Sequence, residues 1–143
     1  MLECRVDLRK TSYSQLVNWE VLVNPSYEEL LLIYNKYCAY KNFKSVCPLF
    51  EEEISKNEVL GYYYENKLSA FSIIVKYDSQ KSVWADQHAW DYANPKLRLG
   101  INSLQNECAY YKSLGYNYLY LGSDDEYKYK LEGFELLGKS WID

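Results

Sequence analysis

Between residues 59 and 92 the hydrophobic side chains recur with a period of two, which is the period of a β-strand. Three such stretches follow one another: Val59–Glu65, Leu68–Tyr77 and Ser82–Tyr92. The connections between them, 65–67 and 78–81, have the length and the polar residues of tight turns. This part of the chain is therefore predicted to form an antiparallel meander.

The sequence before the meander predicts two strands and two helices. Apolar residues at near-alternate positions favour strands at Leu2–Leu8 and Leu16–Val23, the first of them at a sheet edge. Ser26 and Glu29 form a capping box, which predicts that a helix begins there. Pro48 suits the first turn of a second, short helix.

After the meander the pattern changes to that of a helix. Leu104, Cys108 and Tyr111 share one face of a helix that opens near Pro95 and stops at Gly115, a residue typical of helix C-termini. The segments that follow are predicted as an apolar central strand, a short helical segment and a last strand: Tyr116–Leu121, Asp124–Leu131 and Phe134–Ile142. The order β–β–α–α–β–β–β–α–β–α–β predicts an α/β (α+β) fold with a mixed, mainly antiparallel sheet flanked by helices.

Length and charge limit what the chain can do. Its 143 residues predict a single domain over residues 1–143. The net charge is −4, with 16 Lys and Arg against 20 Asp and Glu. A protein that coats duplex DNA is basic, so no DNA partner is expected, although a local basic groove is compatible with this balance. The 17 tyrosines could fill a core or line a groove.

The four cysteines, Cys4, Cys38, Cys47 and Cys108, form no C-x-x-C pair, and His88 is the single histidine. Zinc-ligand spacing is therefore absent, and no metal site is expected. The sequence contains neither a signal-peptide pattern nor an apolar run of about 18 residues. We expect a cytoplasmic protein with reduced thiols and no membrane partner, in which Cys108 packs in the core.

Two segments after residue 82 could carry chemistry. Strand alternation places Asp86 and His88 on one face together with Trp84 and Trp90. A carboxylate and an imidazole between two tryptophans could act as an acid/base pair. The alternative is a half-exposed strand face with a surface histidine.

The second segment is Asp91–Asn102, where a helix begins. The backbone N–H groups and the positive end of the helix dipole attract anions there. Gly100 would let a phosphate approach closely, and Arg98 could reach the same phosphate. The alternative is that the glycine serves packing alone.

Residues 59–143 combine the meander, the long helix and the apolar strand with a set of short motifs: Leu99-Gly100, Leu114-Gly115, Tyr118-Leu119-Tyr120-Leu121-Gly122, Tyr129-Lys130 and Phe134. In its order of elements this part of the chain resembles the acyl-CoA N-acyltransferase (GNAT) fold. Within that superfamily the motifs most resemble the C-terminal domain of tRNA-dependent arginyl- and leucyl-protein transferases. The cysteine-rich N-terminal segment of those transferases has no counterpart here, because the cysteines are scattered.

The resemblance implies transfer of an acyl or aminoacyl group from acetyl-CoA, another acyl-CoA or aminoacyl-tRNA to an amine of a small molecule or protein. Asp86 or His88 would take the proton of the amine, strand N–H groups would stabilise the oxyanion, and Tyr129 would protonate the leaving atom. Lys128 and Lys130 could touch a tRNA end or form a solvated helix face. Donor binding would involve the strand pair and the helix start: Trp90, Arg98, Leu99, Gly100, Ile101, Asn102, Tyr118 and Tyr120.

Two further interpretations stay open. The GNAT pyrophosphate loop has the pattern Gln/Arg-x-x-Gly-x-Gly/Ala, whereas Leu97 and Asn102 occupy its first and last places here. That departure, the small size and the acidic loop Asp124–Glu126 also fit a non-catalytic binding or interaction protein of GNAT fold, including one that forms a homodimer. An open cleft between Ser82–Tyr92 and Tyr116–Leu121 would favour the enzyme.

Overall fold

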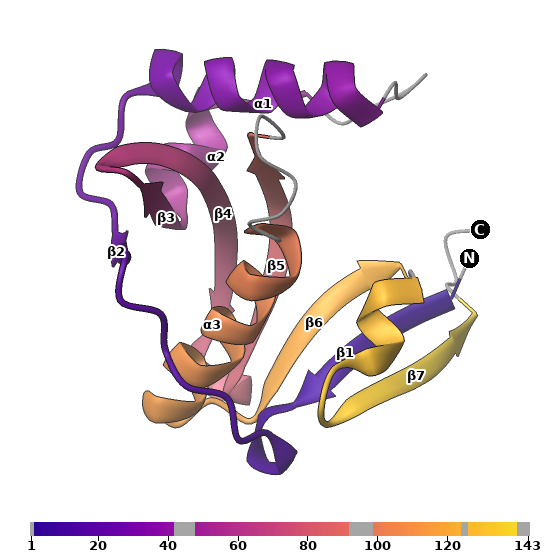
Figure 1. Cartoon of the computed structure of the whole chain (residues 1–143). Coiled ribbons are helices and arrows are strands. Elements are labelled where there is room, and N and C mark those ends of the chain that lie inside the picture. Colours follow the sequence, from indigo (N-terminus) through magenta and orange to yellow (C-terminus); the bar gives the residue numbers. More distant parts are fainter. Residues whose placement is uncertain (1, 42–47, 92–98, 124–125, 140–143) are drawn as a thin grey trace. The chain divides into compact units, whose positions relative to one another are not determined.

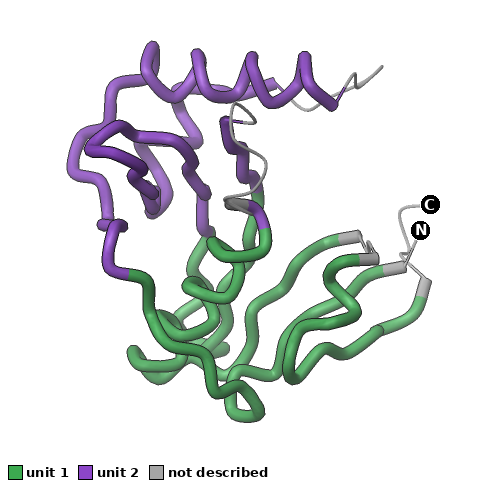
Figure 2. Tube along the Cα trace, in the orientation of Figure 1, with its two compact units in different colours: residues 1–16, 75–86, 101–143 green, residues 17–74, 87–100 purple. Residues whose placement is uncertain are grey.

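A computed structural model describes residues 2–41, 48–91, 99–123 and 126–139 of the chain. The chain divides into two compact units, which are coloured in Figure 2. Unit 1 comprises residues 1–16, 75–86 and 101–143, and unit 2 comprises residues 17–74 and 87–100. The expectation of one domain over residues 1–143 stays a prediction.

The fold is of the α+β class, as predicted. Its strands are β1 Leu2–Asp7, β2 Trp19–Val21, β3 Glu58–Tyr64, β4 Lys67–Tyr77, β5 Ser82–Trp90, β6 Tyr118–Ser123 and β7 Phe134–Lys139. Its α-helices are α1 Tyr27–Lys41, α2 Glu51–Lys56 and α3 Leu99–Ser113 (Figure 1). Hydrogen-bonded neighbours follow the order β2-β3-β4-β5-β6-β1-β7, and the sheet is mainly antiparallel. The predicted order of elements is confirmed, with a 3-10 helix at Glu126–Lys130 in the place of the last predicted helix.

Unit 2 is built on the meander. Glu65 and Asn66 both have positive φ, at 50° and 63°, and they form the two-residue turn between β3 and β4. The buried side chains of this unit come from both helices and from the strands, among them Ile33, Ile54 and Phe71. Burial of this shared apolar surface stabilises the helices against the meander.

The helix α1 begins as the sequence predicts. The hydroxyl of Ser26 accepts a hydrogen bond from the backbone N–H of Glu29 at 3.3 Å, which is the serine half of the capping box. Leu30, Ile33 and Tyr34 are buried. An amphipathic helix of this kind needs the strands beneath it, because helices of this length are marginal alone.

In unit 1 the first strand is an interior strand. β1 pairs antiparallel with β6 on one side and with β7 on the other (Figure 1). The prediction of an edge strand was therefore wrong. Both partners lie more than a hundred residues along the chain, and a local hydrophobic pattern carries no information about such pairing. Burial of Cys4 and Val6 fits the interior position.

The helix α3 buries Leu104, Cys108 and Tyr111, the face that the sequence predicts. Gly115 has φ +94°, and the N–H of Tyr116 donates to the carbonyl of Tyr111 at 3.1 Å, so the helix ends at a glycine in the left-handed region. Burial raises the pKa of the Cys108 thiol. Cys108 is thus a packing residue, as predicted.

One buried carboxylate predicts a pH dependence of stability. Asp7 is 4% exposed, and its carboxylate accepts hydrogen bonds from the side chain and the backbone N–H of Arg9 at 2.9 and 3.1 Å. The guanidinium holds the pKa of Asp7 below its ordinary value of 3.8. A lowered folded-state pKa stabilises the protein above the unfolded pKa, and this contribution is lost as the pH falls through the folded value.

We therefore expect Asp7→Asn to lower Tm at pH 7, and the difference from the wild type to shrink below pH ~4. Asparagine keeps an oxygen for the N–H of Arg9, so the change removes mainly the charge. Thermal unfolding between pH 2.5 and 7 measures the difference. Glu51→Gln on the surface is the control, and a Tm difference for Asp7→Asn that does not vary with pH would contradict the charge argument.

Candidate functional site

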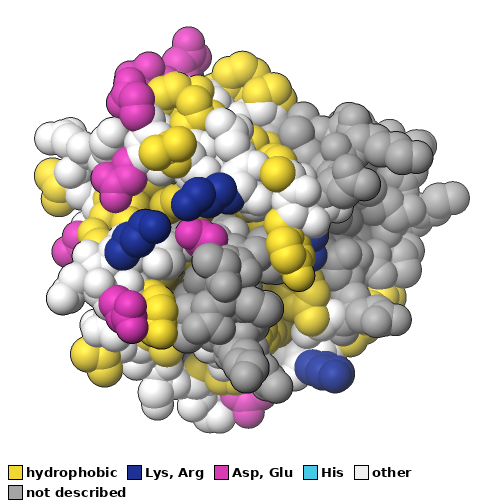
Figure 3. All heavy atoms as spheres, turned by 45° about the horizontal axis from the view of Figure 1, so that its top comes forward, with side chains coloured by type: hydrophobic (Ala, Val, Ile, Leu, Met, Phe, Trp, Pro, Cys, Tyr) yellow, Lys and Arg dark blue, Asp and Glu magenta, His cyan; other side chains and the backbone are white. Residues whose placement is uncertain are grey.

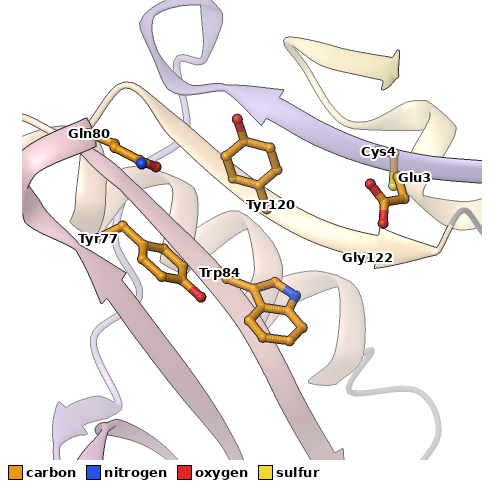
Figure 4. Close-up of a pocket in the computed structure, with 7 residues that line it drawn as sticks. All are labelled: Glu3, Cys4, Tyr77, Gln80, Trp84, Tyr120 and Gly122. Atoms are coloured by element: carbon orange, nitrogen blue, oxygen red, sulfur yellow. The ribbon is translucent and has the colours of Figure 1, made fainter. Parts of the chain in front are cut away.

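Unit 1 contains a pocket of about 350 Å³. It is lined by residues of β1, of the end of β4 and the turn after it, of β5 and of β6: Glu3, Cys4, Tyr77, Gln80, Trp84, Tyr120 and Gly122 (Figure 4). This volume lies at the lower end of the range for small-molecule sites.

The sheet register positions the pocket walls. Trp84 of β5 is paired with Tyr120 of β6, and Cys4 of β1 is paired with Gly122 of β6. Gly122 has φ +75°, and a Cβ there would lie 4.0 Å from the indole Nε1 of Trp84. The glycine therefore supplies a backbone shape that side chains rarely adopt and keeps the space beside the indole open.

β5 and β6 form a parallel pair, whereas the pairs β1–β6, β1–β7, β2–β3 and β3–β4 are antiparallel. The pairing joins Ser82–Trp84 to Tyr118–Tyr120. Asp86 lies in the same unit, two residues beyond Trp84 on the same strand face. Because a strand rises about 3.3 Å per residue, the two Cα atoms are roughly 6.5 Å apart. Asp86 is not one of the residues that line the pocket, but it lies two positions along the strand from Trp84, which does.

The predicted acid/base pair shares strand β5, and both side chains are half-buried. Asp86 belongs to unit 1 and His88 to unit 2. The imidazole of His88 lies 4.8 Å from the ring of Trp90, centroid to centroid. The structure thus gives His88 a packing partner, while its role as a base stays a prediction.

The glycine at the helix start has a packing reason of its own. Gly100 is buried, and a Cβ there would lie 2.8 Å from Cη2 of Trp90. Trp90 also packs on Tyr37, with ring centroids 4.6 Å apart. The absence of a side chain at residue 100 therefore lets the indole pack on the first turn of α3. Whether a phosphate uses the same glycine stays a prediction.

This contact predicts that Gly100→Ala destabilises the protein by roughly 1–2 kcal/mol, because displacing the indole costs more than the helix propensity gained. The free energy of unfolding in urea measures it. Trp90→Phe removes the clashing atoms, so the double variant should recover part of the loss. A more stable Gly100→Ala protein would show that propensity outweighs the contact.

The other predicted donor residues are placed as follows. Arg98 lies outside the described residues, and Leu99 is the first residue of α3. Ile101 and Asn102 are half-buried in the first turn of that helix. Their part in donor binding stays a prediction.

Tyr118 and Tyr120 lie on β6 beside two arginines. The guanidinium of Arg5 stacks over the Tyr118 ring at 3.9 Å and donates to the hydroxyl of Tyr120 at 3.0 Å. Arg5 also forms an ion pair with Glu135 at 2.8 Å. Tyr120 lines the pocket, whereas Tyr118 contributes to this cation–π stack.

The short helix Glu126–Lys130 differs from the expected solvated face. Lys128 is 6% exposed, and its ammonium donates to the carbonyl of Leu121 at 3.4 Å. The prediction of a solvated Lys128 was wrong, because the long aliphatic stem packs inward while the charge finds a carbonyl. Lys130 is exposed. Tyr129 packs on Phe134, with centroids 4.9 Å apart, and is not one of the residues that line the pocket.

Four pocket residues were missed by the sequence analysis: Glu3, Cys4, Tyr77 and Gln80. For Tyr77 and Gln80, the signal that could have pointed to the pocket is the pair of aromatic residues, Tyr77 and Trp84, on either side of the β4–β5 turn. Glu3 and Cys4 gave no signal, since they join the site through pairing with a distant strand.

Neither the surface charge nor the metal-ligating residue types point to a further kind of site. On the face in Figure 3, Lys and Arg lie among Asp and Glu rather than in a block of one sign. Among the residues that the structure describes, no group of three or more His, Cys, Asp or Glu could hold a metal ion. No helix in the described part of the chain has the length and apolar character needed to cross a membrane.

No protein-family model and no curated protein matches the sequence. Solved structures do match. L-PGS from Bacillus licheniformis has a TM-score of 0.68 at 17% identity, over 85% of this chain and 46% of that one. The C-terminal domain of a protein assigned as a lysylphosphatidylglycerol synthetase from Agrobacterium fabrum has a TM-score of 0.65 at 14% identity, over 85% and 45%.

A GCN5-related N-acetyltransferase from Kribbella flavida has a TM-score of 0.55 at 12% identity, over 96% of this chain and 54% of that one. The chain thus spans about half the length of these structures. At such low identities the likeness shows the fold alone. That fold is the GNAT fold, as predicted.

Proposed function

We propose that this chain transfers an acyl or aminoacyl group from a carrier to an amine. The observation that carries the proposal is the pocket of about 350 Å³ in unit 1, because it is lined from both β5 and β6 at their parallel pairing. A pocket there favours an enzyme over a scaffold. The GNAT fold of the matched acetyltransferase supports the same reaction class.

The transfer needs no covalent enzyme intermediate. A base takes a proton from the ammonium, and the nitrogen lone pair then attacks the carbonyl carbon of the donor. The C–S or C–O bond of the tetrahedral intermediate breaks, and the leaving sulfur or oxygen takes a proton. Because Asp86 shares unit 1 and a strand face with Trp84, we favour its carboxylate as the base, directly or through a water molecule, over His88.

Two donor classes fit this proposal, acyl-CoA and aminoacyl-tRNA. Leu97 and Asn102 depart from the acetyltransferase loop pattern, which favours aminoacyl-tRNA. The net charge of −4 disfavours broad contact with a tRNA, so recognition would centre on its aminoacylated end. The resemblance to arginyl- and leucyl-protein transferases agrees with that donor.

Calorimetric titration with acetyl-CoA, coenzyme A and aminoacyl-tRNA tests the proposal, followed by a transfer assay with labelled donor and a panel of amines. We expect one donor to bind and to lose its label to an amine. Arg98→Ala should weaken that donor, and an unchanged affinity would remove Arg98 from the site. Absence of binding at millimolar concentration would contradict the proposal, and binding without transfer would favour the non-catalytic binding protein.

A further inference from the structure

We propose that the pocket of unit 1 binds an organic ammonium ion. Within the proposed function this ion would be the acceptor amine, and to that extent the inference rests on that function. The binding itself requires no transfer and can be measured without a donor. Three features support this binding: the side chains of the pocket walls, the exposure of their rings, and the cation Arg5, which lies over the tyrosines of β6.

The walls combine three aromatic rings with one carboxylate. Tyr77, Trp84 and Tyr120 contribute the rings, and Figure 4 shows the first two next to each other with Tyr120 on the neighbouring strand. Glu3 is the one charged side chain among the seven described residues that line the pocket. The negative faces of aromatic rings attract a cation, and a carboxylate adds to that attraction. The same carboxylate repels the phosphates of a donor.

The rings are accessible to a ligand. Tyr77 is 42% exposed and Trp84 is 36% exposed, so a ligand can reach both rings. The volume of about 350 Å³ lies at the lower end of the range for small-molecule sites, which suits an alkylammonium or choline-sized ion better than a nucleotide.

β6 already uses its tyrosines to hold a cation. The guanidinium of Arg5 lies 3.9 Å from the centroid of Tyr118 and 5.7 Å from that of Tyr120. Glu135 balances this positive charge through its 2.8 Å ion pair with Arg5. The strand thus shows the ring-to-cation geometry inside the chain, and the charge of Arg5 is compensated by Glu135.

Ligand-observed NMR and calorimetry on the full chain, without donor, test the inference with four probes: choline, n-butylammonium, adenosine and 3,3-dimethyl-1-butanol. The last is the uncharged counterpart of choline and isolates the charge. We expect choline or n-butylammonium to bind about tenfold or more tightly than the neutral alcohol. Equal affinities for the cations and the neutral alcohol would overturn the inference. Adenosine that displaced both cations at a concentration below theirs would overturn it as well.

Variants then place the binding in this pocket. Trp84→Leu keeps an apolar wall without the indole, and we expect it to lose about tenfold in affinity for the cation but little for the alcohol. Glu3→Gln should lose about threefold, whereas Glu51→Gln on α2 should lose nothing. Should Trp84→Leu fail to fold, Tyr77→Phe and Tyr77→Leu decide, because the first keeps the ring and should keep the affinity. Unchanged affinity in Glu3→Gln and Tyr77→Leu would overturn the site.

Cation binding without transfer would remove the proposed function and leave this inference standing. Transfer without selective cation binding would remove this inference and leave the proposed function standing. The experiments therefore distinguish failure of one proposal from failure of the other.

Discussion

Replacing Gly133 by alanine will destabilise the protein by about 3 kcal/mol or more. Gly133 has φ +70°, a backbone conformation that costs an alanine about 1–2 kcal/mol. An added Cβ would also overlap the carbonyl oxygen of Asp7 and come within 3.4 Å of its backbone carbon and nitrogen. The N–H of Asp7 donates to the carbonyl of Gly133 at 2.8 Å, so the two backbones cannot separate without losing that bond.

Denaturant unfolding of Gly133→Ala, with Gly115→Ala as its matched control, measures this effect. Gly115 has φ +94° with no atom within 4 Å of an added Cβ, so its alanine variant suffers the backbone strain alone. We expect Gly115→Ala to lose about 1–2 kcal/mol, and the difference between the two variants is the contact with β1. Equal losses would mean that β1 does not approach Gly133 as closely as the structure shows.

The elements of this fold could be predicted because their signals are local. The meander from β3 to β5 follows from alternating side chains and from turns such as Glu65-Asn66. The end of α3 follows from Gly115, which adopts the left-handed conformation that glycine favours. Each of these features is decided within about ten residues.

The parts that could not be predicted depend on distant pairing. The interior position of β1 requires β6 and β7, which form near the other end of the chain. The pocket also depends on this distant pairing, because Glu3 and Cys4 reach it only through the pairing of β1 with β6. The prediction of a solvated Lys128 was wrong for a different reason. The direction of a long side chain is decided by the packing around it, not by its charge.

The tyrosines also differ in whether their surroundings depend on local sequence or on distant pairing. Tyr34 and Tyr111 are buried, which their helix positions predict. The sequence groups Tyr118, Tyr120 and Tyr129 around the donor, but the structure places them differently. Tyr118 and Tyr120 both contact Arg5, and of these two Tyr120 lines the pocket, whereas Tyr129 packs on Phe134. Spacing along β6 gives the strand face of a tyrosine, whereas its neighbour depends on β1 and β7.

Asp86→Asn will lower kcat for the proposed transfer by about 10²- to 10⁴-fold, the usual contribution of a positioned base. Asparagine has nearly the shape of aspartate but cannot take the proton of an ammonium. Because the substitution leaves the pocket walls unchanged, KM for the amine should change less than about threefold. A steady-state assay with a saturating donor separates the two constants.

A structural role for Asp86 would give a different set of results. Asp86→Glu keeps a carboxylate and should recover part of the rate, whereas a merely structural position would tolerate the longer side chain no better than asparagine. His88→Gln, two residues along the same strand, is the matched comparison. If His88→Gln loses the rate and Asp86→Asn does not, the imidazole is the base. If both variants keep the rate, neither residue is the base. The proton of the amine is then taken by a group outside this strand face.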